Sequence, residues 1–379
     1  MAEKNENLRS RLISGINVVS LNPFIAHIKK NENGKCSFLT KNGLCELHSK
    51  LGIGYLCHTC KSYPRIICNV NGEVEAFLAM SCESAVRNIL FNTKIMSLEK
   101  KEIDFDSIFN NELKPENYVH GKHGVDIFKI IRSASIYIIQ TRKYSFWKRM
   151  IILGILIQEV DDLLVSAKER VINDEIEEAI SKIIDEYLKN INKGGFEKYF
   201  SQIPENFNFK VSFTFKLFNQ LNEEYQSNEA FEILNDCIYK MRDGLGIVKN
   251  GNTMLEIFQN YTDVYKRYYL PFFEDRDYVF ENYVVNTLFI RGFPFNYSTR
   301  SSVYDNYLEM VVKYVLLRFL FIGMAGHYRE NFGENEIVKG VIGFSRPFGH
   351  SQEIIEAIID AMKISGMTKI GKLSMLLKN

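Results

Sequence analysis

The spacing of apolar residues predicts helices over most of the chain beyond residue 123. Three stretches there carry apolar residues at i, i+3 and i+4, a spacing that places them on one helical face. They are "DIFKIIRSASIYIIQTR", "SFWKRMIILGILIQEVDDLLVSAKERV" and "NDEIEEAISKIIDEYLKNI". The same criterion predicts further helices over residues 216–242, 252–269, 276–290, 303–324 and 350–364. Residues 196–215 are predicted to be irregular or extended.

The part before residue 123 has a different pattern. Leu8, Leu12 and Ile16 recur four residues apart, which predicts a short helix followed by a connection. "NVNGEVEAFLAM" carries alternating apolar residues after an Asn-Gly turn and predicts a strand or short hairpin. A serine suited to N-capping predicts a helix from about Ser81. Residues 93–118 are polar, include Pro115, and are predicted to be a linker.

These patterns predict a mainly α protein in which a small cysteine-rich metal module is joined to a large helical body. The expected boundaries are residues 1–92 for the N-terminal helix with the cysteine-rich module, 93–118 for the linker and 119–379 for the helical body. No strand–GxGxG–helix segment is present, so a Rossmann-type nucleotide-binding fold is not expected.

Composition narrows the classes of partner. The chain has 379 residues, is 46% hydrophobic and has a net charge of +1, which argues against a nucleic-acid binder. Its polar start lacks the pattern of a signal peptide. Lys313 and Arg318 interrupt the apolar stretch 311–326, which is therefore expected to be a buried helix rather than a membrane span. We expect a cytoplasmic protein with neither a nucleic acid nor a membrane as partner.

Five of the seven cysteines lie between Cys36 and Cys68. Four of them, Cys36, Cys45, Cys57 and Cys60, have the spacing C-x8-C-x11-C-x2-C, in which the last pair can reach one metal centre from one tight turn. Clustered cysteines in a reducing compartment more often bind metal than form disulfides. Four thiolates suit a structural zinc ion or an iron–sulfur cluster, and spacing alone does not choose between them.

Other residues near this cluster are weaker candidates. His48 could bind a metal, although a supporting or surface position is favoured, and Cys68 is a less favoured ligand. Cys237 stands alone on a predicted helix and is expected in the core. Arg65 could donate to a carboxylate or to the sulfides of a cluster.

The ordered series "CSFL", "GLCELH", "LG", "LCHTCKSYPR" and "SC" at Ser81–Cys82 resembles the flagellin lysine N-methylases of bacteria. "FWKRMIILGILI", "ENYVVNTLFIRGFPF" and "YVLLRFLFIGMAG" extend the resemblance over most of the chain. The resemblance implies methyl transfer from S-adenosylmethionine to lysine side chains of flagellin, a bound [4Fe–4S] cluster and no Rossmann-type fold.

The resemblance also bears on the site residues. It matches Cys36, Cys45 and Cys60 most firmly and adds Cys82, whereas Cys57 has the better local spacing, so all five are candidate metal ligands. The adjoining Tyr63 and Arg65 are candidate cofactor-binding residues. The family pattern includes a further cysteine-rich stretch ahead of the point where this chain starts, which leaves the complete ligand set open.

Methyl transfer to a lysine requires a neutral amine, although the free amine has a pKa of about 10.4. A site must therefore desolvate the amine or supply a base. The aromatic stretch 261–286 carries the carboxylates Glu274, Asp275, Asp277 and Glu281. They could line a pocket, but helix packing with a polar turn is the favoured interpretation, and no catalytic residue is assigned.

Two other functions remain open at this stage. The cysteine module could be a metal-stabilised staple, with zinc or an iron–sulfur cluster, in a protein-binding module without catalysis. An electron-transfer role would need a second redox partner, and no flavin or nicotinamide motif is visible.

Overall fold

The computed structural model describes residues 6–21, 24–32, 34–100, 102, 111–118, 123–167, 174–225, 231–247, 253–296, 302–350 and 352–378. The chain forms two compact units, Met1–Tyr63 and Pro64–Asn379. Each unit has its own cluster of buried apolar residues. The larger cluster belongs to the helical body, so the predicted mainly α class is confirmed.

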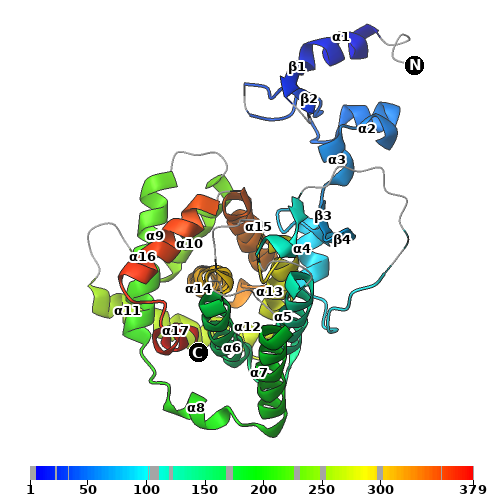
Figure 1. Ribbon diagram of the computed structural model, residues 1–379. Coiled ribbons are helices and arrows are strands. Elements are labelled where there is room, and N and C mark those ends of the chain that lie inside the picture. The colour runs from blue at the N-terminus through cyan, green and yellow to red at the C-terminus, as the bar shows by residue number, and fades with distance from the viewer. Residues whose placement is uncertain are drawn as a thin grey trace. The chain divides into compact units, whose positions relative to one another are not determined.

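The smaller unit consists of short elements around a small core (Figure 1). These are α1 (Glu6–Gly15), β1 (Ile16–Leu21), β2 (Phe24–Ile28), α2 (Glu46–Leu51), a 3-10 turn (Ile53–Tyr55) and α3 (His58–Ser62). β1 and β2 pair antiparallel, where the sequence predicted only a connection after the first helix. Phe38 and Leu47 are its buried apolar residues, and Cys36 and Cys45 pack against them. A core of this size usually needs a further source of stability.

A three-stranded sheet begins the larger unit. β3 (Arg65–Val70) and β4 (Glu73–Leu78) pair antiparallel around Asn71 and Gly72, which have positive φ angles of 51° and 82°. Two successive residues of this conformation suit a tight hairpin turn, so the predicted hairpin is confirmed. β5 (Asn111–Leu113) pairs parallel with β3. Part of the predicted linker therefore belongs to the sheet.

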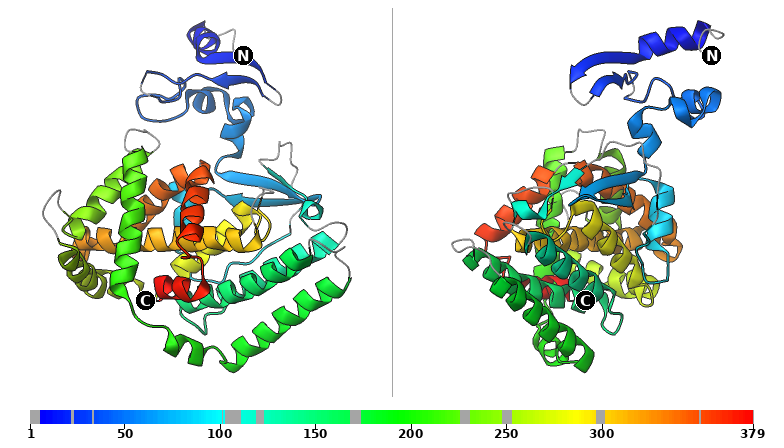
Figure 2. Two further views of the ribbon diagram at one scale, coloured as in Figure 1. Left: turned by 60° about the vertical axis from the view of Figure 1, so that its left-hand side comes forward. Right: turned by 45° about the vertical axis from the view of Figure 1, so that its right-hand side comes forward.

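The rest of the larger unit is helical (Figures 1 and 2). Its α-helices are α4 (Glu83–Leu90), α5 (His123–Gln140), α6 (Phe146–Ala167), α7 (Asp174–Lys193), α8 (Glu197–Gln202), α9 (Phe207–Tyr225), α10 (Glu232–Gly244), α11 (Met254–Val264), α12 (Leu270–Phe273), α13 (Tyr278–Arg291), α14 (Val303–Tyr328), α15 (Glu334–His350), α16 (Gln352–Ile364) and α17 (Ile370–Leu377). Shorter turns are η3 (Pro115–Asn117), the π-helix η5 (Tyr265–Tyr269) and η6 (Arg329–Asn331).

The long helix α14 occupies the middle of the helical body (Figures 1 and 2). It is buried on every side along most of its length, so the prediction of a buried helix is confirmed. Its two internal cations have acceptors: Lys313 Nζ lies 2.5 Å from the carboxylate of Glu309, and Arg318 Nη1 donates to Leu377 O at 3.1 Å. None of the helices in the described ranges is long and apolar enough to cross a membrane.

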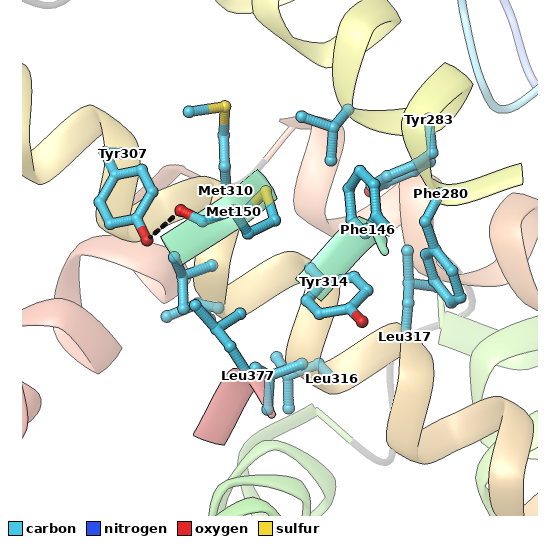
Figure 3. Packing of buried hydrophobic residues seen from close by; sticks show 14 of the residues in the cluster. Phe146, Met150, Phe280, Tyr283, Tyr307, Met310, Tyr314, Leu316, Leu317 and Leu377 are labelled. Carbon is cyan, nitrogen blue, oxygen red and sulfur yellow. Dashed lines mark hydrogen bonds between the residues drawn. The ribbon is translucent and has the colours of Figure 1, made fainter. Parts of the chain in front are cut away.

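Figure 3 shows the apolar packing between α6, α13 and α14. The Tyr307 hydroxyl donates to Met150 O at 2.9 Å across this interface. A Cβ on Gly154 would lie 2.3 Å from that hydroxyl oxygen. The absence of a side chain at residue 154 is thus what admits the tyrosine to the interface.

The prediction of irregular or extended structure for residues 196–215 is wrong, because α8 and the first part of α9 lie there. "FNFKVSFTF" alternates apolar and polar residues, a pattern typical of a strand. Its buried positions are instead Lys210, Val211 and Thr214, followed by Leu217 and Phe218, which is the spacing of one helical face. The predicted helix 216–242 is divided between α9 and α10, and residues 226–230 lie outside the described residues.

The boundary between the two compact units lies after Tyr63, whereas the sequence predicted a module boundary after residue 92. Cys68, Val86 and Leu90 are fully buried in the main core, so β3 and α4 pack with the helical body. Neither sheet in the described ranges is a doubly wound parallel sheet, since one has two strands and the other has the order β4-β3-β5. The expected absence of a Rossmann-type fold agrees with this topology.

Candidate functional site

Four of the five candidate metal ligands belong to the smaller unit, where short elements position them. Cys36 and Cys45 each form an isolated β-bridge, and Cys45 is also the residue preceding α2. Cys57 precedes α3, and Cys60 lies within that helix. Residues three apart across a helix start lie on the same side of the turn, so these last two thiols are neighbours.

The electrostatics of Cys60 show that the four thiols lie close together. Burial is the main cause that raises the pKa of Cys60 to about 12. The thiols of Cys57, Cys36 and Cys45 raise the same pKa further, because each added negative charge would repel a thiolate at Cys60. A bound metal would reverse this preference, since metal–sulfur bonds require the thiolate.

The donor set fits a metal–sulfur centre in its chemistry, but the geometry of a single-ion site is not met. All four cysteines are free thiols in this structure. Within the described residues, however, no group of three or more His, Cys, Asp or Glu side chains could hold a metal ion as they lie. The thiols are therefore grouped without being in contact with a common point, and their assignment as ligands stays a prediction.

The remaining cysteines belong to the larger unit. Cys82 is half-buried and precedes α4, the helix predicted to start near Ser81, and its role as a ligand also stays a prediction. Cys68 is buried in β3. Cys237 is fully buried in α10, which confirms the expectation that it belongs to the core.

The two candidate cofactor-binding residues stand on either side of the division between the units. Tyr63 follows α3 and is 49% exposed, and Arg65 begins β3 and is exposed. Their predicted role is not tested by this arrangement. His48, which the sequence favoured as a supporting or surface residue, is exposed on α2.

The helical body contains a cavity of about 330 Å³ that sequence reasoning assigned no function. It lies between the α5–α6 connection and the α12–α13 connection. Its lining residues are Arg142, Lys143, Tyr144, Ser145, Arg149, Glu274, Asp275, Asp277 and Tyr278. The signal in the sequence was the run of carboxylates in 274–281, but nothing there indicated that cations from residues 142–149 would face them.

A buried ion-pair network forms the inner wall of this cavity. Glu281 is fully buried and accepts from Arg149 Nη1 at 2.6 Å and from Arg142 Nη2 at 2.8 Å. Arg149 is 1% exposed and also donates to Ile139 O at 2.6 Å. Charges buried to this extent are retained only when they are paired and hydrogen-bonded.

Asp277 connects the two sides of the cavity. Its carboxylate accepts the Phe146 backbone N–H at 2.7 Å, which satisfies a free donor at the start of α6. Burial raises the pKa of Asp277. The Phe146 N–H and the positive charge of Arg149 act in the opposite direction, but burial has the larger effect. Glu281 and Asp277 therefore have packing roles, as the favoured interpretation of this acidic run anticipated, and Asp277 also lines the cavity together with Glu274 and Asp275.

Comparison with known proteins gives a family match over most of the helical body. A family model described as "FliB lysine N-methylase C-terminal domain" matches residues 132–376. The matched range includes every residue that lines the cavity.

Individual relatives match over shorter stretches. A stretch of 76 residues is 36% identical to "Flagellar biosynthetic protein FliU" of Salmonella muenchen and covers 20% of this chain and 45% of that protein. A stretch of 70 residues is 34% identical to proteins named "Lysine-N-methylase" from Salmonella typhimurium and Salmonella choleraesuis and covers 18% of each chain. The chain thus spans less than half of the length of these relatives, and no solved structure matches it.

Proposed function

Because the chain belongs to the FliB lysine N-methylase family, we propose that it transfers methyl groups from S-adenosylmethionine to lysine side chains of flagellin, with a [4Fe–4S] cluster. The observation that carries the proposal is the family match over residues 132–376. At the level of the family, this match supports a methyltransferase role. Flagellin as the substrate is supported by the flagellar name of one relative.

The reaction requires a site that holds a cationic donor and removes a proton from the acceptor amine. Because the lysine ammonium cannot attack, burial must lower the pKa of the amine, or a general base must accept its proton. The cavity in the helical body has the exposed carboxylates Glu274 and Asp275 at its wall and the buried charges of Arg149 and Glu281 behind it. These features are compatible with the reaction and do not by themselves select it.

The grouped thiols support the cluster. Four thiolates around one zinc ion lie about 3.8 Å apart, given zinc–sulfur bonds of about 2.3 Å in a tetrahedron. In a four-iron cluster, irons and sulfides separate the cysteine sulfurs, so the ligands stand farther apart. The thiols of Cys36, Cys45 and Cys57 raise the pKa of Cys60 although the described residues form no single-ion site, an arrangement compatible with the wider spacing of a four-iron cluster. Cys82 remains a further candidate.

The cluster, when bound, would provide iron sites able to coordinate a ligand, and its binding free energy would also fold the smaller unit. The reaction would take place in the cytoplasm before flagellin is exported. Free thiols are typical of a reducing compartment, which supports that location.

The test is a methylation assay with purified flagellin and the full chain isolated under anaerobic conditions. Mass spectrometry of flagellin peptides is expected to show lysines heavier by whole methyl groups only when S-adenosylmethionine is present. Iron and sulfide analysis of the same preparation is expected to show both elements and no stoichiometric zinc. The binding-module alternative would be favoured if the immobilised protein retains flagellin on a column while the flagellin lysines stay unmodified.

A further inference from the structure

The cavity between the α5–α6 and α12–α13 connections has walls of opposite charge. Arg142, Lys143 and Arg149 come from the first connection and the start of α6. Glu274 and Asp275 come from the second connection. A ligand that fills this space must therefore offer a negative group and a positive group within a few bond lengths of each other.

Arg142 in the cationic wall is held in place by hydrogen bonds that do not use all of its N–H donors. Arg142 gives its Nε–H and an Nη2–H to Glu281 and an Nη1–H to Thr93 O at 2.7 Å. Each terminal nitrogen of a guanidinium carries a second N–H, and the Arg142 side chain is 36% exposed. Two N–H groups on Arg142 thus remain available to a carboxylate in the cavity.

Arg149 adds a buried donor without an acceptor. Its side chain is 1% exposed, and its Nε has no hydrogen-bond partner among the described residues. A buried cation with an unmet donor strengthens the positive potential at this wall, because little water screens it.

The anionic wall is unoccupied by protein partners. Within the described ranges, the side chains of Glu274 and Asp275 form no ion pair or hydrogen bond, and both residues are exposed. Asp277 is already engaged by the Phe146 N–H. Tyr278, half-buried beside these carboxylates, adds an aromatic ring, and aromatic faces attract cations.

We propose that this cavity holds the amino-acid end of the sulfonium donor, S-adenosylmethionine; this inference rests on the proposed function and assigns its donor site. The α-carboxylate lies against Arg142, and the α-ammonium and sulfonium lie against Glu274 and Asp275. A charge-assisted hydrogen bond is about twice as strong as a neutral one, so both ends of the zwitterion are recognised.

Other ligand classes fit the same walls less well. A lysine side chain brings one positive charge and no negative group for the remaining N–H donors of Arg142. A phosphate-bearing nucleotide would meet repulsion from two free carboxylates. The volume of about 330 Å³ is at the lower end of small-ligand sites and suits part of the donor, with the nucleoside toward the open side.

The test measures binding of tritium-labelled S-adenosylmethionine to the full chain with its metal by equilibrium dialysis. The double variant Glu274→Gln, Asp275→Asn is expected to raise Kd at least tenfold, because it removes both free carboxylates and keeps the side-chain shapes. The matched control is Asp185→Asn, Glu186→Gln on α7, an adjacent exposed pair that undergoes the same chemical change. Its Kd is expected to stay within twofold of the parent value.

A second probe separates the two ends of the donor. Methylthioadenosine lacks the amino-acid end and the sulfonium charge, so the cavity variant is expected to bind it as the parent does. An equal loss of affinity for both ligands would overturn the assignment. Parent-like binding of S-adenosylmethionine by the cavity variant would overturn the site and leave the proposed function standing. Failure of the parent protein to bind S-adenosylmethionine at all would overturn the proposed function together with this inference.

Discussion

The buried carboxylate of Glu281 is the residue on which the arrangement of charges in the helical body depends. It faces two guanidinium groups, one of which belongs to Arg149 and is almost completely buried. Removing one partner of such a network leaves the other charge in a medium of low dielectric, which costs far more than the pair itself contributes. Loss of the Glu281 carboxylate would therefore leave the buried charge of Arg149 without its close partner, which would destabilise the fold.

We predict that Glu281→Gln lowers the free energy of unfolding by about 3–5 kcal/mol, because Arg149 loses its close counter-charge. Urea denaturation followed by circular dichroism measures this quantity. The control is Glu83→Gln, which breaks the exposed pair with Arg87 and should cost about 0.5 kcal/mol or less. Equal stability of the two variants would show that Glu281 does not carry this network.

A second buried charge gives a pH dependence. Burial is the main cause that lowers the pKa of Lys210 to about 6, and the nearby positive charges of Arg318 and Lys378 also lower it. The carboxylate of Glu205 acts in the opposite direction and raises it. Between that pKa and the unfolded value of about 10.4, the unfolded chain binds a proton that the folded chain lacks. Raising the pH through this window therefore stabilises the fold.

We predict that the free energy of unfolding rises with pH between pH 6.5 and 8.5. The slope is expected to exceed the slope of the Lys210→Met variant by up to about 1.4 kcal/mol per pH unit. Parallel urea titrations of the two proteins across this range measure the difference. Identical slopes would mean that Lys210 keeps its proton in the folded state. The methionine keeps most of the unbranched apolar stem of the side chain and removes the amine, so the comparison mainly reports the charge.

At the scale of elements, the crossing of α10 and α14 depends on glycines. A Cβ on Gly323 would lie 2.7 Å from Met241 O and 2.8 Å from Met241 Cα, and one on Gly244 would lie 1.9 Å from Gly323 O. These neighbours are backbone atoms, which cannot rotate away. The two helices approach this closely because Gly244 and Gly323 have no side chains to separate them.

We predict that Gly323→Ala destabilises the protein by about 3 kcal/mol, because the helices must separate to admit one methyl group. Thermal and urea unfolding both report the change. Gly371→Ala is the matched control, since residue 371 lies in α17 and a Cβ there would meet nothing within 4 Å. Alanine favours a helix, so this control should be neutral or more stable by up to about 1 kcal/mol.

At the scale of the whole molecule, the two compact units have very different means of stabilisation. The helical body has an extensive apolar core, whereas the smaller unit buries only Phe38 and Leu47 among its described apolar residues. A unit with so little buried area is expected to rely on a metal–sulfur centre, whose binding free energy is then folding free energy.

We predict that Cys60→Ser loses the metal and exposes the unit Met1–Tyr63 to protease, while the helical body keeps most of its circular dichroism signal. Iron and sulfide content, together with limited proteolysis, measures both effects. Cys237→Ala, a change at a buried thiol of the helical body, should leave the metal content at the parent value. Full metal content in Cys60→Ser would remove this residue from the ligand set.

The sequence by itself determined the features that depend on neighbours along the chain. Apolar residues at helical spacing predicted α5, α6, α7 and the buried α14, and the Asn-Gly turn predicted the β3–β4 hairpin. The cysteine spacing predicted a metal site between Cys36 and Cys60; the thiols of Cys36, Cys45 and Cys57 raise the pKa of Cys60, and their role as ligands stays a prediction. Such features depend on residues close together in the chain, so the sequence of one protein is enough to predict them.

Only the tertiary structure decided the features that depend on distant partners. Residues 196–215 were predicted to be irregular or extended, but burial of one helical face against the body made α9 a helix. Glu281 meets Arg149 across 132 residues of sequence, and no local pattern marks that pair. The charged cavity exists because packing brings two remote connections together, and the free energy of that packing belongs to the whole core rather than to either segment.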